Sequence, residues 1–125
     1  MNHIHLVALL ALVQYIVFAS LVGRARAIHG VRAPAVQGVE AFERIYRVQM
    51  NTLELLVAFL PALYIASAYW PSALVAGLGT VYLLGRLVYW RAYVADPAKR
   101  GLGYLLSMGP VMLLVGLGAW GALKP

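Results

Sequence analysis

Four long apolar stretches, joined by short polar connections, restrict what this chain can fold into more than any other feature. The first stretch, at residues 4–23, is long enough to cross the roughly 30 Å of hydrocarbon in a bilayer as a helix. Hydrophobic residues make up 63% of the sequence and charged residues 11%, whereas a soluble domain carries about 25% charged residues. We therefore predict an all-α fold, a single membrane domain over residues 1–125. Its four transmembrane helices are expected at residues 4–23, 41–69, 73–93 and 102–123.

Residue content and flanking sequence exclude several classes of function. The sequence contains no cysteine, which rules out disulfides, thiolate metal sites and a cysteine nucleophile of its own. No metal-binding, P-loop or dinucleotide-binding motif is present, so we predict no metal. The first apolar stretch has no basic residues before it and is too long for the core of a signal peptide, so we expect it to remain as a helix.

The basic residues predict how the chain is oriented in the membrane. Nine of the ten Lys and Arg residues, all except Lys124, lie in or beside the two connections at residues 24–42 and 94–101. The turn at residues 69–72 has none. Positive connections face the cytoplasm, so both termini are expected on the opposite side. Orientation accounts for the net charge of +6, and we predict no nucleic acid partner. The short loops are typical of a bacterial inner-membrane protein.

A polar stretch at residues 43–54 leads into the second apolar segment. Its side chains at Arg44, Arg47, Asn51 and Glu54 are spaced so that they share one helical face. A charge drawn toward hydrocarbon costs roughly 2.5–3.5 kcal/mol on insertion scales, so such residues mark a candidate site. Arg47 and Glu54 are about 10 Å apart along a helix axis, and we expect no direct ion pair between them.

The third apolar segment ends in polar and aromatic residues at the same predicted membrane depth. Arg86, Tyr89 and Tyr93 follow one face of the helix, Arg100 lies just beyond it, and Arg26 could reach in from the first helix. Arginines outnumber the carboxylate, so the expected partner is anionic, with a cationic or donor group to meet the acidic residue. Guanidinium groups bind carboxylates in bidentate fashion. A second, lipophilic molecule could enter this site sideways from the lipid bilayer.

Several of these residues also have a purely structural interpretation. Arg44 and Arg91 lie near helix ends, where arginines commonly anchor a helix at the membrane interface. Arg47, Asn51 and Glu54 could instead form an internal network that ties helices together.

Glycine, proline and one aspartate predict local features of the bundle. The third segment is rich in glycine, which lets helices approach closely. Prolines inside the second and fourth segments predict kinks, and Asp96 with Pro97 predicts a capped helical turn. The glycines and kink-forming prolines are Gly77, Gly79, Gly85, Pro61 and Pro110.

Two sequence blocks resemble a known family, the membrane-associated proteins in eicosanoid and glutathione metabolism (MAPEG). The pattern E-R-x-x-R-x-x-x-N-x-x-E is complete here, from Glu43 to Glu54. The strings FERIYRVQMN at residues 42–51 and VYLLGRLVYWRAY at residues 81–93 are similar to the leukotriene C synthase and microsomal glutathione transferase branch. The resemblance covers essentially the whole chain.

The resemblance implies a homotrimer with glutathione, the co-substrate, bound between neighbouring subunits near the cytoplasmic face. It also implies that Arg100 stabilises the glutathione thiolate. The residues that would hold glutathione are Arg26, Arg47, Gln49, Asn51, Glu54, Tyr89 and Tyr93. Two positions differ from the branch: Leu55 replaces a tyrosine, and Asp96-Pro97 breaks the helix before Arg100.

We therefore predict a membrane-bound glutathione-dependent transferase or peroxidase that acts on a lipophilic electrophile or hydroperoxide. One alternative is a non-catalytic, lipid-binding membrane scaffold of the same family, which would bind without forming a thiolate. Another is a small four-helix multidrug exporter, which needs an unpaired, titrating carboxylate in the membrane. Glu54 lies one helical turn from Asn51 and two turns from Arg47, which disfavours the exporter.

Overall fold

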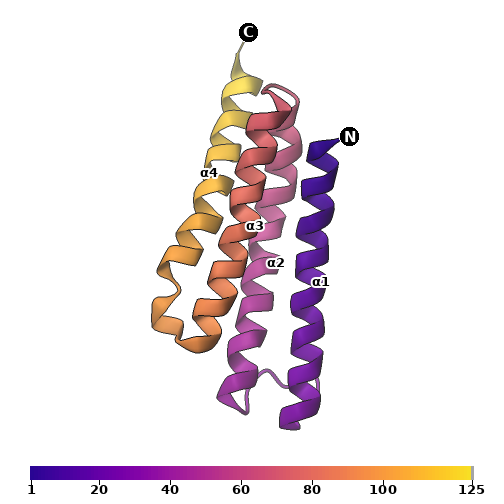
Figure 1. Cartoon of the computed structure of the whole chain (residues 1–125), viewed down its shortest axis with the longest axis vertical. Helices are drawn as coiled ribbons and strands as arrows, with labels where there is room; N and C mark the ends of the chain where they lie inside the picture. The colour runs from indigo at the N-terminus through magenta and orange to yellow at the C-terminus, as the bar shows by residue number, and fades with distance from the viewer. Residues whose placement is uncertain (125) are drawn as a thin grey trace.

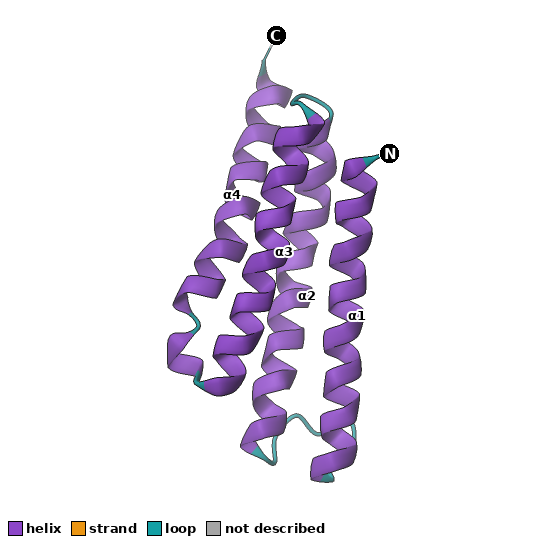
Figure 2. Ribbon diagram, viewed as in Figure 1, coloured by secondary structure: helices purple, strands orange, loops and turns teal. Residues whose placement is uncertain are grey.

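The computed structural model describes residues 1–124 and arranges four long helices side by side (Figure 1; Figure 2). Within these residues, each of the four helices is long and apolar enough to cross a membrane. The prediction of an all-α fold with four membrane-spanning helices is confirmed at this level. The elements are α1 (His3–His29), α2 (Glu40–Ser67), α3 (Ser72–Ala95), the 3₁₀ turn η1 (Pro97–Lys99) and α4 (Gly101–Leu123).

The main difference from the predicted boundaries lies at the end of α1. The helix was expected to end at residue 23, but Gly23 stays helical and the helix continues to His29, where Gly30 ends it. Gly30 has a φ of 68°, a left-handed conformation that glycine adopts without steric cost, and its N–H bonds the carbonyl of Arg26. The first connection is therefore shorter than predicted. The other predicted helix ends fall within two residues of the observed ones.

The two basic connections lie at one end of the bundle, and both termini lie at the other (Figure 1). The charge pattern predicted this arrangement. It brings the polar first half of α2 and the polar end of α3 to the same level. The side of the membrane that each end faces stays a prediction.

Glycines allow α3 and α4 to approach closely. A Cβ atom added at Gly85 would lie 2.6 Å from the carbonyl carbon of Leu106, and one added at Gly103 would overlap the backbone of Tyr89. Real Cβ atoms do not come this close, so only glycine fits at these positions. The predicted role of Gly85 is confirmed.

The other predicted features of the helix interiors give a mixed result. A Cβ added at Gly79 would meet Val7 of α1 at 2.5 Å, which confirms a close approach there. Gly77 faces open space, so that prediction is wrong. Pro61 and Pro110 lie inside α2 and α4, which continue past them, and the predicted kinks stay predictions.

Large apolar side chains cover much of the outer surface as well as the core. Core side chains such as Phe59 and Tyr82 stack with ring centroids 3.8 Å apart. On the outside, Val57 is 71% exposed and Met112 is 67% exposed. Burying apolar surface is the main driving force of folding in water, so this outer surface suits contact with lipid or another subunit.

Candidate functional site

Arg86 lies at the centre of a polar network that joins three helices. The whole residue is buried, with 0% of its surface exposed. Its Nη1 donates hydrogen bonds to Asn51 Oδ1 at 2.7 Å and to Thr52 Oγ1 at 3.2 Å, both on α2. Its Nε donates to Ser107 Oγ of α4 at 2.9 Å. We call Arg86, Asn51, Thr52 and Ser107 the buried network.

The buried network holds its cation without a carboxylate partner among residues 1–124. The guanidinium carbon lies 4.4 Å from the ring centre of Tyr89, a cation–π contact. Thr52 and Ser107 donate their own protons to carbonyls of their helices, which leaves oxygen lone pairs for Arg86. Asn51, a predicted glutathione ligand, has its side-chain oxygen engaged here.

Sequence reasoning missed Thr52 and Ser107. Their signal is weak, because Ser107 is a lone serine in an apolar segment and Thr52 is an uncharged residue among the charged ones of the polar stretch at residues 43–54. Nothing in the spacing along one helix reveals that both face an arginine on another.

Arg47 and Glu54 form an ion pair, with Arg47 Nη2 2.8 Å from Glu54 Oε1. The prediction that they do not pair directly is wrong. Two helical turns separate them along the axis, but positions seven apart share a face, and the long side chains reach toward each other. Their side chains are 46% and 55% exposed, respectively, so the pair is open on one side. We call Arg47 and Glu54 the exposed pair.

A cavity of about 410 Å³ lies at the basic end of the bundle, between the start of α2 and the end of α3. Arg47 and Tyr93, both predicted glutathione ligands, line it together with Arg44 and Pro97. The ring of Tyr93 stacks on that of Tyr89, with centroids 5.4 Å apart. The structure therefore brings a cationic side chain of α2 and the aromatic end of α3 to one opening.

Two further predicted ligands make contacts at the α1 side of the bundle. Arg26 Nη1 donates to the carbonyl of Ala35 at 2.8 Å, and its guanidinium lies 4.8 Å from the ring centre of Phe42. Gln49 Nε2 donates to the hydroxyl of Tyr15 at 3.2 Å. Neither contact joins these residues to the exposed pair.

Arg100, the predicted thiol-activating residue, is exposed at the start of α4. Its Nη1 donates to the carbonyl of Pro97 at 2.9 Å. Asp96 caps η1 by accepting a hydrogen bond from the Ala98 amide at 3.1 Å, as predicted. Within residues 1–124, Arg100 has no hydrogen bond or ion pair to another predicted site residue.

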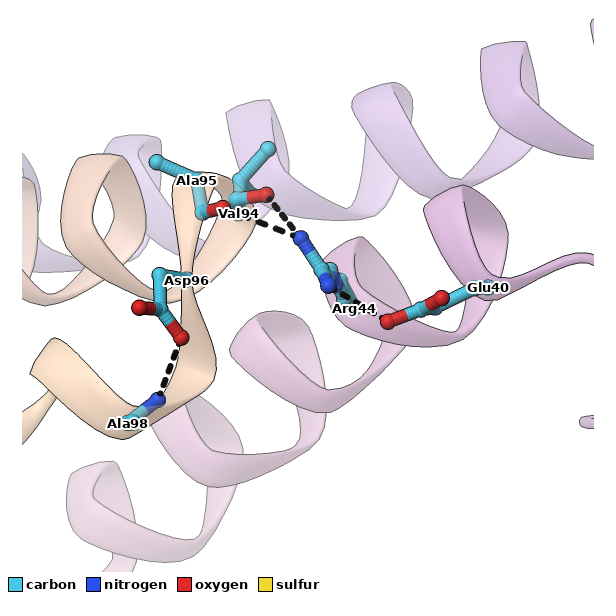
Figure 3. Close-up of polar contacts among 6 residues, drawn as sticks. All are labelled: Glu40, Arg44, Val94, Ala95, Asp96 and Ala98. Atoms are coloured by element: carbon cyan, nitrogen blue, oxygen red, sulfur yellow. Dashed lines mark hydrogen bonds and ion pairs between the residues drawn. The ribbon is translucent and has the colours of Figure 1, made fainter.

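Arg44 makes contacts within the protein, and its role as an anchor at the membrane interface stays a prediction. It pairs with Glu40 on its own helix, and it donates hydrogen bonds to the carbonyls of Val94 and Ala95 (Figure 3). Arg91 is exposed, with its guanidinium 5.4 Å from the ring centre of Trp90. Among residues 1–124, no group of His, Asp and Glu side chains is placed to hold a metal ion.

Comparison with known proteins identifies the relatives of this chain. Residues 4–120 match the sequence profile of the MAPEG family. Microsomal glutathione S-transferase 2 of Homo sapiens is 39% identical over 115 residues, which cover 92% of this chain and 78% of the human protein. Leukotriene C4 synthase of Cavia porcellus is 35% identical over 117 residues, which cover 94% and 78%. An uncharacterized protein of Synechocystis sp. is 46% identical over 112 residues, which cover 89% and 82%. The chain thus belongs to the MAPEG family and is an integral membrane protein.

Proposed function

We propose that this protein is a membrane-bound glutathione transferase, which joins the glutathione sulfur to a lipophilic electrophile or reduces a lipophilic hydroperoxide. The observation that carries the proposal is the exposed pair. Arg47 and Glu54 present opposite charges on the face of a helix that otherwise runs into hydrocarbon. Charged side chains where a helix enters the membrane mark a binding site by default, and this pair is left open to a polar partner.

Glutathione has the groups that this face requires. It carries two carboxylates, one ammonium group and a thiol. The forked guanidinium of Arg47 suits a carboxylate, and Glu54 suits the ammonium. We assign Tyr89, Tyr93 and Asn51 to the same site, because Tyr93 lines the cavity beside Arg47 and Asn51 lies between the two charges on α2.

We further propose that the functional unit is a homotrimer, with glutathione bound between neighbouring subunits. Two features support this. Apolar side chains such as Leu105 of α4, 66% exposed, leave ample surface for subunit contacts. Arg100 has no hydrogen bond to the exposed pair within one subunit, whereas a site between subunits can bring it to the exposed pair of a neighbour. Arg26 and Gln49 would complete the wall on the α1 side.

Thiolate stabilisation is the chemical core of this proposal. A cysteine-type thiol has a pKa of about 8.5, and only its thiolate is an effective nucleophile. A guanidinium near the sulfur favours the thiolate and lowers this pKa, by 1 unit for about 1.36 kcal/mol of interaction. The thiolate attacks an electrophilic carbon, an S–C bond forms, and the electron pair passes to the leaving group or to an acceptor that is then protonated. The bilayer concentrates the lipophilic substrate beside the sulfur. Such chemistry serves detoxification.

The proposed location is a bacterial inner membrane, with both basic connections in the cytoplasm. Glutathione, a water-soluble anion, would enter from that side, and the lipophilic substrate from the bilayer. In this orientation, the two routes would meet at the cavity at the basic end.

The test uses the purified protein in detergent. Glutathione binding is measured by calorimetry, and conjugation is followed with 1-chloro-2,4-dinitrobenzene as the electrophile. We expect saturable binding and turnover by the wild type, both weakened in Arg47→Ala and retained in Arg91→Ala. Binding without turnover or thiolate would favour a lipid-binding scaffold. Absence of binding would refute the proposal. Proton-driven drug transport in proteoliposomes would instead revive the exporter, although the pairing of Glu54 with Arg47 disfavours it.

A further inference from the structure

At the end of α3, the backbone carbonyls of Val94 and Ala95 are among those that lose their helical donors. In a continuing helix, the carbonyls of Val94 and Ala95 would accept from the amides of residues 98 and 99. Here the Ala98 amide donates to the Asp96 side chain, and the Lys99 amide donates to the Asp96 carbonyl at 2.9 Å. Proline at position 97 ends the helix because it has no N–H. The end of the helix therefore leaves the carbonyls of Val94 and Ala95, like that of Tyr93 opposite Pro97, without their helical donors.

Arg44 of α2 supplies the missing donor. Its Nη1 lies 3.0 Å from the Val94 oxygen and 3.1 Å from the Ala95 oxygen, and Glu40 holds the other side of the guanidinium (Figure 3). A cation at a helix C-terminus is also favoured by the helix dipole. The Arg44 side chain is only 26% exposed, so the contact is partly shielded from solvent.

The segment that Arg44 holds leads directly to Arg100. The turn η1 begins two residues after Ala95, and both the backbone N–H and Nη1 of Arg100 donate to the carbonyl of Pro97, at 3.3 Å and 2.9 Å. Hydrogen bonds at Val94, Ala95, Asp96 and Pro97, together with the short backbone segment that joins these residues, thus connect α2 to Arg100. Pro97 and Arg44 also line the cavity that contains Arg47.

We propose that Arg44 is a positioning residue for Arg100. By holding the carbonyls of Val94 and Ala95, it fixes the direction of η1 and hence the place of the Arg100 guanidinium. This inference rests on the proposed function, in which Arg100 stabilises the thiolate. It gives the two arginines of α2 different tasks: Arg47 meets glutathione, and Arg44 orients the group that activates it.

The first test separates orientation from substrate binding. Arg44→Ala is compared with Arg91→Ala, which removes an exposed arginine at the same end of α3. At saturating glutathione, we expect Arg44→Ala to lower kcat by about 10- to 100-fold, since small displacements of a reacting group have effects of this size. The rise of kcat with pH should also shift to higher pH in this variant, while the glutathione KM changes little. A raised KM with unchanged kcat would overturn the proposal and make Arg44 a direct ligand, and unchanged kinetics would also overturn it.

The second test needs no glutathione. Amide hydrogen exchange over residues 96–101 is measured in the free protein in detergent. Arg44→Ala should speed exchange in this segment, and Arg91→Ala should not. Unchanged exchange would show that Arg44 does not hold this segment, and it would overturn the positioning role whether or not the protein is a glutathione transferase. Faster exchange with normal thiolate formation would overturn the link to Arg100 while leaving the proposed function intact.

A double-mutant cycle tests the orphan carbonyls themselves. Pro97→Ala restores a backbone N–H and lets the helix extend toward residue 98, which reduces the need for Arg44. In that background, Arg44→Ala should lower kcat by a clearly smaller factor than in the wild type. Equal factors in the two backgrounds would show that Arg44 does not act through the carbonyls.

Discussion

The buried network and the exposed pair both take residues from one stretch of α2, yet their surroundings differ sharply. Arg86 is fully buried, and three side chains on two other helices accept its protons. Within residues 1–124, the side chains of Arg47 and Glu54 form hydrogen bonds only with one another, and about half of each is exposed. Asn51 lies between the two charges along the helix but turns its oxygen inward to Arg86. One region is enclosed by the protein, although Arg86 Nη2 is buried without a hydrogen-bond partner within residues 1–124, and the other region is open to a partner.

Under the proposed function, the family motif combines two tasks in one stretch of helix. A buried polar group is costly when unpaired, so the network holds α2, α3 and α4 in fixed positions. The exposed pair gains little stability from its own contact, because solvent weakens it. Mutations in the buried network should therefore lower the free energy of unfolding. Mutations in the exposed pair should instead weaken glutathione binding.

The largest expected effect is the loss of stability in Arg86→Ala. Removing the buried side chain leaves a cavity and an unpaired Asn51 oxygen, and such core truncations cost about 3 kcal/mol of unfolding free energy. The measurement is SDS-induced unfolding from mild detergent, with the exposed Arg91→Ala as the control. A variant as stable as the wild type would remove the contrast between the two regions.

Next in size is the loss of glutathione affinity in Arg47→Ala. A charge-assisted hydrogen bond is worth about 1.5–3 kcal/mol, which corresponds to roughly a 10- to 100-fold rise in Kd. The free energy of unfolding should change by less than about 1 kcal/mol, because the pair with Glu54 is half exposed. Calorimetric titration and unfolding of the same preparation measure both quantities. A large loss of stability without loss of affinity would make this pair structural.

The smallest effect is expected in Ser107→Ala. This change removes one acceptor from Arg86 Nε and should cost about 1 kcal/mol of unfolding free energy. Glutathione affinity should stay the same, since Ser107 is buried away from the cavity that contains Arg47. Loss of affinity with full stability would mean that the network takes part in binding directly.

Much of the fold could be predicted from the sequence, because apolar runs and charged connections directly reflect the membrane. The family motif likewise identified the relatives of the chain. Features that depend on local backbone conformation or on packing between helices were harder to predict. The end of α1 at His29 depends on where the first left-handed glycine occurs. Gly77 and Gly85 are both glycines of α3, but Gly77 faces open space and Gly85 lies against the backbone of α4.

The candidate site shows the same limit. The spacing of Arg47 and Glu54 along the helix did not reveal their contact, because long side chains span the distance that the backbone creates. The partners of Arg44 are carbonyls of another helix, and a backbone acceptor leaves no mark in the sequence. Only packing between helices reveals such contacts.

The most direct test of the account is the ultraviolet absorbance of the glutathione thiolate, measured on adding glutathione to the purified protein at pH 7. The wild type should show thiolate although this pH lies below the ordinary thiol pKa of about 8.5. Arg100→Ala should bind glutathione but form thiolate only at higher pH, because the loss of the guanidinium raises the pKa of the thiol back toward its usual value. Bound glutathione without thiolate in the wild type, or equal thiolate in both proteins, would contradict the account.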